Sequence, residues 1–317
     1  RVDYDGTASS LLVEPERKNE VTYSEDFSQW STNATVTLNE AISPDGTQNA
    51  SLFSHSGGSF PQVALTGITF VSGADYSPSL YVKSDGTSQV QHSLLINNVV
   101  VNFTPTDEWV RISDLIVSPD TSGSFVIAQN SGSSVAASFY IWGAQLEAGS
   151  YATSYIPTDG GTVTRVQDQY SKTGISNLIN SEEGVLFLEM AALSNDGTNK
   201  RISLSNGSNS YRIVISYSTS NNIQIFIVGA PAGTFAPSKS IDITLNSKIA
   251  VSWSSTEARF YVDGSPILVT SGDFSYTAST LSELKTEDGA GGSEYFGKVK
   301  QLQVYTTADV DLAALTS

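Results

Sequence analysis

The sequence contains no cysteine, so disulfide bonds and thiolate metal sites are excluded. Its histidines are His55 and His92 alone, which leaves no basis for a histidine-rich zinc site or a Ser-His-Asp triad. No apolar run approaches the roughly 20 residues that span a bilayer, and no signal peptide is recognisable, so we expect no membrane insertion. The chain opens at Arg1 without an initiator methionine, and we expect it to be part of a longer polypeptide.

Basic residues are also few. Lysine and arginine together number 16 against 32 acidic residues, which gives a formal charge of −16. Such a chain repels phosphate backbones, and no basic cluster is interleaved with aromatics, so nucleic acid is not an expected partner. The acidity suits an exposed protein that must stay soluble, or one that supplies oxygen ligands to a hard cation.

The abundant residues are those of short strands and polar turns. Charged residues make up only 15% of the chain and hydrophobic residues 39%, while serine, threonine, asparagine and glycine are frequent. Runs rich in β-branched and aromatic residues end at turn signals about every 8–12 residues, which is typical of a sandwich or jelly roll. We therefore predict an all-β fold of two tandem antiparallel β-sandwiches.

Turn-rich stretches divide the chain into four segments. These are a leading segment (1–20), a first sandwich (21–156), a linker (157–177) and a second sandwich (178–317). In the first sandwich we expect strands at 34–38, 63–70, 77–84, 89–98, 109–117, 122–129 and 136–147. In the second we expect them at 185–193, 200–205, 210–218, 223–229, 239–245, 247–255, 257–264 and 293–306.

Three local signals in the second sandwich are more specific. Asp263-Gly264 predicts a tight type I′ hairpin turn between two β runs. Trp253 is expected in the core. Residues 308–315 predict a short C-terminal helix with Thr307 as its N-cap.

Three phrases of the first sandwich resemble a module of bacteriophage tail-fibre and head-fibre proteins. They are LLVEPERKNEVTYSEDFSQW (11–30), SPDGTQNA (43–50) and FYIWGAQLEAGSYATSYIPTDGGTVTRVQD (139–168). The resemblance implies a jelly roll similar to carbohydrate-binding modules. Lys18 and Glu20 depart from the module's usual threonine and leucine, and they place charge where that family has an apolar contact.

The second sandwich resembles the concanavalin-A-like, laminin-G-type lectin domain. The resemblance is carried by KIAVSWSSTEARFYVDGSPI (248–267) and YFGKVKQLQVYTTADVDLAAL (295–315). It bears on fold more than on function, because the same sandwich carries enzymes, lectins and protein-binding modules.

Aromatic residues supply the candidate glycan-binding positions, because sugar C–H groups stack on exposed rings. The candidates are Trp142, Tyr151, Tyr155, Trp30 and Trp109. Each tryptophan also fits a core position, which is the interpretation we favour. The tyrosines, beside the expected linker, could be exposed or could seal the domain junction.

Structural Ca²⁺ is the one cofactor that the sequence suggests. By resemblance, Glu25, Asp26 and Asp45 stand where similar jelly rolls bind Ca²⁺ near the first strand. Asp196 in NDGTN (195–199) and Asp288 in EDGAGG (287–292) lie in acidic, glycine-bearing loops. All of these residues also fit ordinary solvated turns.

The sequence offers no convincing catalytic pair. A retaining glycosidase needs two carboxylates about 5 Å apart. The nearest candidate, ELKTED (283–288), lacks the ExDxxE spacing, and the adjacent Glu182 and Glu183 point to opposite faces of a strand. We therefore expect no catalytic residues and no enzyme activity.

The leading hypothesis is a non-catalytic virion surface protein, a fragment of a phage tail fibre or spike. It would bind host-surface polysaccharide or a receptor through weak sites multiplied by avidity. The resemblance alone implies a homotrimer, other virion proteins as partners, and a location on the exterior of the phage particle. Two alternatives stay open: a capsid decoration or head-fibre structural protein, and the accessory domains of a polysaccharide depolymerase.

Overall fold

The computed structural model describes residues 2–5, 8–58, 60–87, 90–129, 135–219 and 221–317. The chain is nearly all β, as the composition predicts, and it separates into two compact units. The first unit is Glu16–Val166, and the second combines Arg1–Pro15 with Gln167–Ser317. Among the described residues, no helix has the length and apolar character needed to cross a lipid bilayer.

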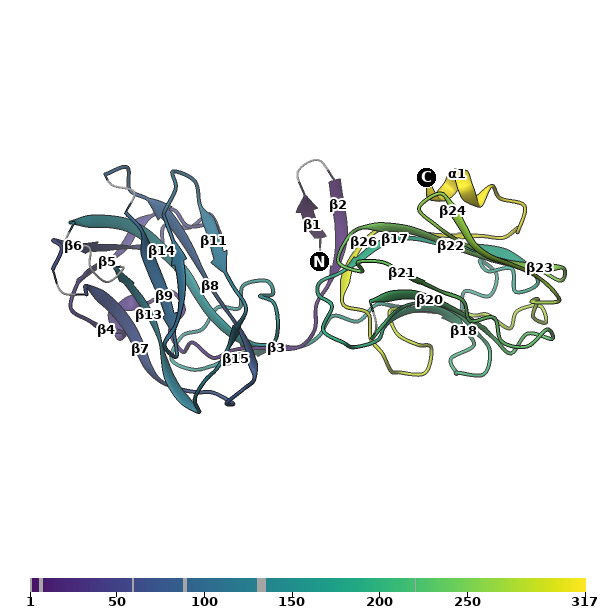
Figure 1. Cartoon of the computed structure of the whole chain (residues 1–317), viewed down its shortest axis with the longest axis horizontal. Coiled ribbons are helices and arrows are strands. Elements are labelled where there is room, and N and C mark those ends of the chain that lie inside the picture. The colour runs from purple at the N-terminus through teal and green to yellow at the C-terminus, as the bar shows by residue number, and fades with distance from the viewer. Residues whose placement is uncertain (1, 6–7, 59, 88–89, 130–134, 220) are drawn as a thin grey trace. The chain divides into compact units, whose positions relative to one another are not determined.

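The first unit is a sandwich of antiparallel sheets (Figure 1). One sheet holds β4 (Ser31–Thr32), β7 (Gln62–Thr69), β9 (His92–Ile96), β10 (Val99–Phe103) and β13 (Ser122–Gln129), in the order β10-β9-β13-β7-β4. The other holds β5 (Thr35–Ala41), β6 (Ala50–His55), β8 (Asp75–Ser84), β11 (Val110–Ser113) and β14 (Ala137–Ala148), in the order β11-β8-β14-β6-β5. A short strand, β12 (Ile116–Val117), also pairs with β8, and the 3-10 helix η1 (Phe27–Gln29) precedes β4.

Period-two alternation builds the core of this unit. Phe139 and Ile141 on β14 are fully buried, and they belong to the same cluster as Leu80 on β8 and Phe125 on β13. Because successive side chains point to opposite faces of a sheet, Tyr140 and Trp142 lie on the other face of β14.

Most strands expected in this unit are confirmed within a few residues. The strand expected at 109–117 is split into β11 and β12, and Asp114 Oδ1 accepts from the Leu115 amide between them. Of the strand expected at 89–98, residue 89 lies outside the described residues. Within the rest, residues 92–96 form β9, which turns back into β10 through Asn97 and Asn98, both with positive φ (46° and 67°). Asparagine tolerates this left-handed conformation, so Asn97-Asn98 forms the hairpin turn. Strands β6 and β10 were not predicted.

Buried polar groups join β14 to the segment that follows it, within the phrase 139–168. Glu147 is fully buried, and its carboxylate accepts from both the backbone amide and the hydroxyl of Thr153. Gln145 accepts from the amide of Ile156 at 2.6 Å. These bonds fold residues 149–156 back onto β14, because buried polar groups are costly without partners.

Asn19 ties the leading segment to the same network. It lies on β3 (Arg17–Asn19), which pairs with β15 (Val163–Arg165), and it is fully buried. Its amide donates to the carbonyls of Ala144 and Ile156, and its oxygen accepts from the amides of Val21 and Leu146. On either side, Lys18 and Glu20 form an ion pair of 2.8 Å with each other, so the unusual charges stay at the surface.

The second unit is also a sandwich (Figure 1). One sheet contains β1 (Val2–Asp5), β2 (Ala8–Val13), β17 (Gly184–Ala192), β22 (Ser247–Trp253), β23 (Glu257–Val262), β24 (Ser265–Ser271) and β26 (Gly297–Tyr305), in the order β1-β2-β26-β17-β22-β23-β24. The other contains β16 (Ser171–Thr173), β18 (Lys200–Ser205), β19 (Arg212–Ser218), β20 (Asn222–Val228), β21 (Ser238–Ser240) and β25 (Glu283–Lys285), in the order β16-β25-β18-β19-β20-β21.

Its core confirms the expected alternation. On β20, Ile223, Ile225 and Ile227 are fully buried, and so is Trp253 at the end of β22. Between β23 and β24, Asp263 and Gly264 have φ values of 48° and 75°, which confirms the expected hairpin turn.

The C-terminal helix is shorter than predicted and begins later. The helix α1 (Leu312–Thr316) is capped by Asp311, whose carboxylate accepts from the amides of Ala313 and Ala314. The prediction of Thr307 as N-cap is therefore wrong, because Asp311 meets the first free amides of the helix. Leu312 packs against Val185 and Phe187 on the outer face of the sheet.

The segments expected as leader and linker contain strands of both units. The stretch 157–177 includes β15 in the first unit and β16 in the second, and the units divide between Val166 and Gln167. Both strands are short and exposed, so their polar sequence has the composition of a linker. The leading segment likewise gives β2 to the second unit, where Val13 is fully buried, and β3 to the first.

Candidate functional site

The structure places two of the candidate aromatic platforms out of reach of a ligand. Trp30 is 4% exposed in the core, where it lies edge-on to Phe125 and donates its indole N–H to the Tyr23 carbonyl. Trp142 is 3% exposed and packs between Tyr81 and Tyr155. A buried ring cannot stack on a glycan, so we correct both residues from candidate platforms to packing residues.

The other aromatic candidates are partly exposed but engaged in local contacts. The Tyr155 hydroxyl donates to Glu25 at 2.9 Å and lies 2.6 Å from Ser24 Oγ, and burial raises its pKa well above the usual value. Tyr151 lies under the guanidinium of Arg17. Trp109 is half-buried and donates its indole N–H to the carbonyl of Ile42. Glycan binding by these residues stays a prediction.

Of the calcium candidates, Glu25 and Asp45 are brought together by Asn49. The Asn49 amide nitrogen lies 2.9 Å from Glu25 Oε2 and 3.2 Å from Asp45 Oδ2. Asn49 Oδ1 is buried and has no hydrogen-bond partner among the described residues. A rotated Asn49 side chain would present this oxygen where the two carboxylates meet, so the donor set fits a hard cation.

The remaining calcium candidates are committed to other partners. Asp26 caps the helix η1 through the amide and hydroxyl of Ser28. Asp196 pairs with Lys200, and Asp288 lies 3.6 and 3.7 Å from the guanidinium groups of Arg201 and Arg212. At Asp196 and Asp288, the side chains of lysine and arginine thus lie where a bound metal ion would have to be. In the described parts of the chain, no three His, Asp or Glu side chains converge as a metal site.

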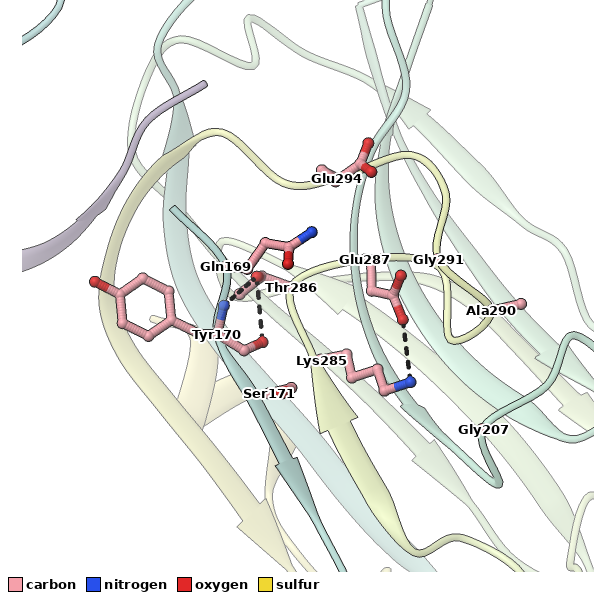
Figure 2. Close-up of a pocket in the computed structure, with 10 residues that line it drawn as sticks. All are labelled: Gln169, Tyr170, Ser171, Gly207, Lys285, Thr286, Glu287, Ala290, Gly291 and Glu294. Carbon is pink, nitrogen blue, oxygen red and sulfur yellow. Dashed lines mark hydrogen bonds and ion pairs between the residues drawn. The ribbon is translucent and has the colours of Figure 1, made fainter. Parts of the chain in front are cut away.

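A polar pocket at the β16–β25 edge of the second unit is the candidate functional site. Figure 2 shows its lining, which comes from residues 169–171, Gly207, residues 285–287, residues 290–291 and Glu294. We call this the edge pocket. Its volume is about 370 Å³. That size lies within the range of small-molecule sites.

Strand pairing positions the two walls of the edge pocket. Ser171 is paired with Lys285 across β16 and β25, which places both side chains on one face of the sheet. Thr286 holds Tyr170, the residue just before β16. Its hydroxyl accepts from the Tyr170 amide at 3.1 Å, and its own amide donates to the Tyr170 carbonyl. The amide of Gln169 and the carboxylates of Glu287 and Glu294 surround the hollow (Figure 2).

The electrostatics of the edge pocket are dominated by carboxylates. Lys285 forms ion pairs of 2.9 Å with Glu283 and 3.3 Å with Glu287. The hydrogen bond to Glu283 raises the pKa of Lys285, so the ammonium stays charged in the neutral range. With Glu294, the three carboxylates outweigh this single ammonium, and the pocket favours uncharged or cationic ligands.

Asp288 holds the loop that forms the far wall of the pocket. Its Oδ1 accepts from the amides of Ala290 and Gly292, and its backbone carbonyl accepts from Arg212 at 2.7 Å. Its carboxylate also lies beside Arg201 and Arg212 on the outer face of the sheet. The wall is therefore built before a ligand arrives, which reduces the cost of ordering it on binding.

Glu283 and Glu287 do not form the arrangement that a glycosidase requires. The ammonium group of Lys285 forms ion pairs with both carboxylates, whereas a retaining mechanism needs two carboxylates that flank the bond to be cleaved. Of the other acidic residues in these stretches, Asp288 pairs with Arg201, and Glu183 accepts a hydrogen bond from the amide of Ala308. The ion pairs of Lys285 therefore partly neutralise the carboxylates of Glu283 and Glu287.

The sequence drew attention to half of this pocket. Residues 283–288 and 287–292 were considered for catalysis and calcium because of their acidic and glycine-rich character. Gln169 and Tyr170 were missed because they lie in the stretch expected as a linker. No apolar alternation marks QDQYSKT (167–173), because β16 is a short strand of polar, exposed residues.

No protein-family model matches the sequence, and a search of curated proteins finds no relative. Among solved structures, the chain is similar to the CBM40 of the Ruminococcus gnavus IT-sialidase bound to α2,3-sialyllactose. The identity is 12% and the TM-score 0.39, over 47% of this chain and 98% of that one.

Two further similarities are with an enzyme and a pentraxin. The leech intramolecular trans-sialidase is 15% identical with a TM-score of 0.40, over 47% of this chain and 26% of the enzyme, so the match spans about a quarter of its length. The heptameric SAP-like pentraxin of Limulus polyphemus is 13% identical with a TM-score of 0.35, over 46% of this chain and 72% of the pentraxin. Likeness at this level carries no argument about what this chain binds.

Proposed function

We propose that this chain is a non-catalytic glycan-binding protein, and that it works on the exterior of a bacteriophage particle as part of a fibre or spike. The observation that carries the glycan-binding part is the edge pocket. It combines an open polar hollow with the amide of Gln169 and the hydroxyls of Ser171 and Thr286 (Figure 2). Sugar hydroxyls need such donors and acceptors.

The proposed absence of catalysis rests on Lys285. Its ammonium contacts both nearby carboxylates, so neither is placed as a nucleophile or as a proton donor to a bond between sugars. Incubation with host polysaccharide should therefore release no new reducing ends. Release that is lost in a Glu287→Gln variant would favour the depolymerase alternative.

The assignment to a phage particle rests on the phrases 11–30, 43–50 and 139–168, which resemble the fibre module. In the same proposal, the partners are a host-surface polysaccharide or receptor and other virion proteins, and the assembly is a homotrimer. Antibodies against this chain should label the tips of fibres or spikes in electron micrographs of intact phage. Label distributed over the head would favour the decoration alternative.

We also propose a structural Ca²⁺ in the first unit, held by Glu25, Asp45 and Asn49. Its support is the buried, unpartnered oxygen of Asn49, which belongs to an amide whose nitrogen contacts both carboxylates. When bound, the ion would supply the charge that draws these oxygens together and would fix the loop 43–49 against Glu25. Asp26, Asp196 and Asp288 are not part of this proposal, because their carboxylates serve other partners.

Binding by the purified chain to an array of bacterial surface polysaccharides and their oligosaccharide fragments tests the glycan-binding proposal. The Ala290→Trp variant should lose binding, because Ala290 is exposed and lines the edge pocket, which the indole would fill. The matched control is Ala314→Trp, at an exposed alanine of α1 on the opposite sheet. Equal binding by Ala290→Trp and the unmodified chain would place the glycan elsewhere.

A further inference from the structure

A second hollow lies at the end of the same sheet, beyond the turn that borders the edge pocket. It has a volume of about 500 Å³ and is lined by Asn206, Tyr211, Gly229, Ser275, Tyr276 and neighbouring threonines. We call it the end pocket. Gly207 lines the edge pocket and Asn206 lines the end pocket, so the loop 206–211 between β18 and β19 borders both pockets.

Tyr211 is the exposed aromatic ring of the end pocket. It keeps 43% of its surface accessible, far more than Trp30 or Trp142. The buried Tyr276 supports it from one side, with 6.4 Å between ring centroids and an angle of 76° between the rings. Tyr276 is itself held by its hydroxyl, which lies 3.0 Å from the carbonyls of Arg212 and Val228.

Gly229 determines where the Tyr211 ring can lie. A Cβ at this position would be 2.2 Å from the Ser210 carbonyl oxygen and 2.7 Å from Tyr211 Cδ1. The glycine also has a φ of +86°, which side chains disfavour. The ring therefore packs directly on the backbone, and a larger residue at 229 would displace it.

The polar groups of the end pocket are uncharged. None of the described residues that line it is acidic or basic. The Asn206 oxygen accepts from Ser208, which leaves its amide nitrogen to donate, and Ser275 donates to Asp273, which leaves its hydroxyl oxygen to accept. An aromatic ring beside neutral donors and acceptors suits a neutral sugar more than a charged ligand.

We infer that the end pocket is a second sugar subsite, stacked on Tyr211, and that a neutral oligosaccharide crosses the Asn206–Gly207 turn to occupy both pockets. This inference rests on the proposed glycan-binding function. It assigns the ligand as a chain of several uncharged sugars, because carboxylates surround the edge pocket and the end pocket offers no cation to an acidic sugar.

The test follows backbone amides by NMR while neutral oligosaccharides are added. The probes are the hexaoses of the malto, cello, manno and chito series, each compared with its monosaccharide and with a sialylated trisaccharide. Gly291 reports on the edge pocket, Gly207 on the turn and Gly229 on the end pocket. A matching hexaose should shift all three in one saturable titration, whereas its monosaccharide should bind at least tenfold more weakly.

Variants separate this inference from the proposed function. Tyr211→Ala should weaken hexaose binding about fivefold to tenfold, the size of a lost stacking contact, while Tyr211→Phe keeps the ring and the affinity. Gly229→Ala should act like Tyr211→Ala, and thermal melting checks that each variant is folded. Shifts at Gly291 alone, unaffected by Tyr211→Ala, would overturn the second subsite and leave the proposed function standing. No shift with any sugar would overturn both.

Discussion

The imidazole rings of His55 and His92 share one hydrogen bond, with 3.2 Å between their Nε2 atoms. His92 Nδ1 lies 2.7 Å from the Val90 carbonyl, so it carries a proton and leaves Nε2 as the acceptor. His55 Nε2 must then donate, and its Nδ1 accepts from the Gly57 amide at 3.3 Å. The pair is consistent only with two neutral rings.

This pair should make the stability of the first unit depend on pH. Burial lowers the pKa of both rings, that of His92 to about 4, whereas an unfolded histidine titrates near 6.5. Since the folded pKa is the lower one, the stabilisation is complete above about pH 6.5 and is lost as the pH falls toward 4. For His92 the loss amounts to about 3 kcal/mol.

Urea unfolding between pH 7.5 and 4.5, followed by tryptophan fluorescence, checks this pH dependence. Trp30, Trp109 and Trp142 all belong to the first unit and report on it. A variant with His55→Leu and His92→Leu should be nearly flat across this range. If it loses stability on acidification as the unmodified chain does, the imidazoles are not the cause.

Asn19→Leu should destabilise the first unit by about 4 kcal/mol or more. The substitution removes four hydrogen bonds and leaves the amides of Val21 and Leu146 and the carbonyls of Ala144 and Ile156 buried without partners. Chemical denaturation measures the loss. Lys18→Thr, one residue away and exposed, is the control and should change the unfolding free energy by less than about 0.5 kcal/mol. Similar effects of the two variants would contradict the network.

Asp288→Ala should weaken both the second unit and the edge pocket. It leaves the guanidinium groups of Arg201 and Arg212 without their shared carboxylate, at a cost of about 2–4 kcal/mol. It also frees the amides of Ala290 and Gly292, so glycan affinity should fall with the lost order of the wall. Calorimetry of unfolding and of binding measures both effects. Asp309→Ala, on the loop before α1, is the control, and an Asp288→Ala variant of unchanged stability would refute the role.

Calcium should stabilise the first unit. If Ca²⁺ at 1 mM is about tenfold above its dissociation constant, the gain is about 1.4 kcal/mol over the EDTA-treated protein. Asn49→Ala should abolish the gain, because it removes the oxygen that rotation of the amide would bring between Glu25 and Asp45. Asp196→Asn should retain it. Melting curves that are identical in EDTA and calcium would exclude a structural ion.

The fold was predictable where local pattern determines structure. The β20 isoleucines alternate strictly, and Asp263-Gly264 specifies its own turn, so these features could be read from the sequence. The partner of a short strand could not, because β2 pairs with β26, almost the whole chain away, and nothing local encodes that register. Likewise, Ile141 and Trp142 lie on opposite faces of β14, so alternation predicts that only one of them is buried. Both are buried, because Tyr155 packs over Trp142 on the outer face.

The candidate site was predictable in part for the same reason. The acidic, glycine-bearing loop 287–292 stands out in the sequence, but whether Asp288 meets a cation or Arg201 and Arg212 depends on strands far along the chain. Tyr211 was passed over because a tyrosine within a strand pattern is ordinarily a core residue.

Glu14 and Asp168 are hydrogen-bonded to each other where the chain leaves and re-enters the second unit. The amide of Asp168 donates to the Glu14 carbonyl at 2.8 Å, and the amide of Glu14 donates to Asp168 Oδ2 at 3.0 Å. In the sequence, the first unit is thus inserted between two segments of the second unit. Joining Pro15 directly to Gln167 should remove the first unit without removing a strand of the second. A fragment that starts at residue 178 would instead lack β2 and β16. Strand β26 would then be an unpaired edge strand, which is prone to aggregation.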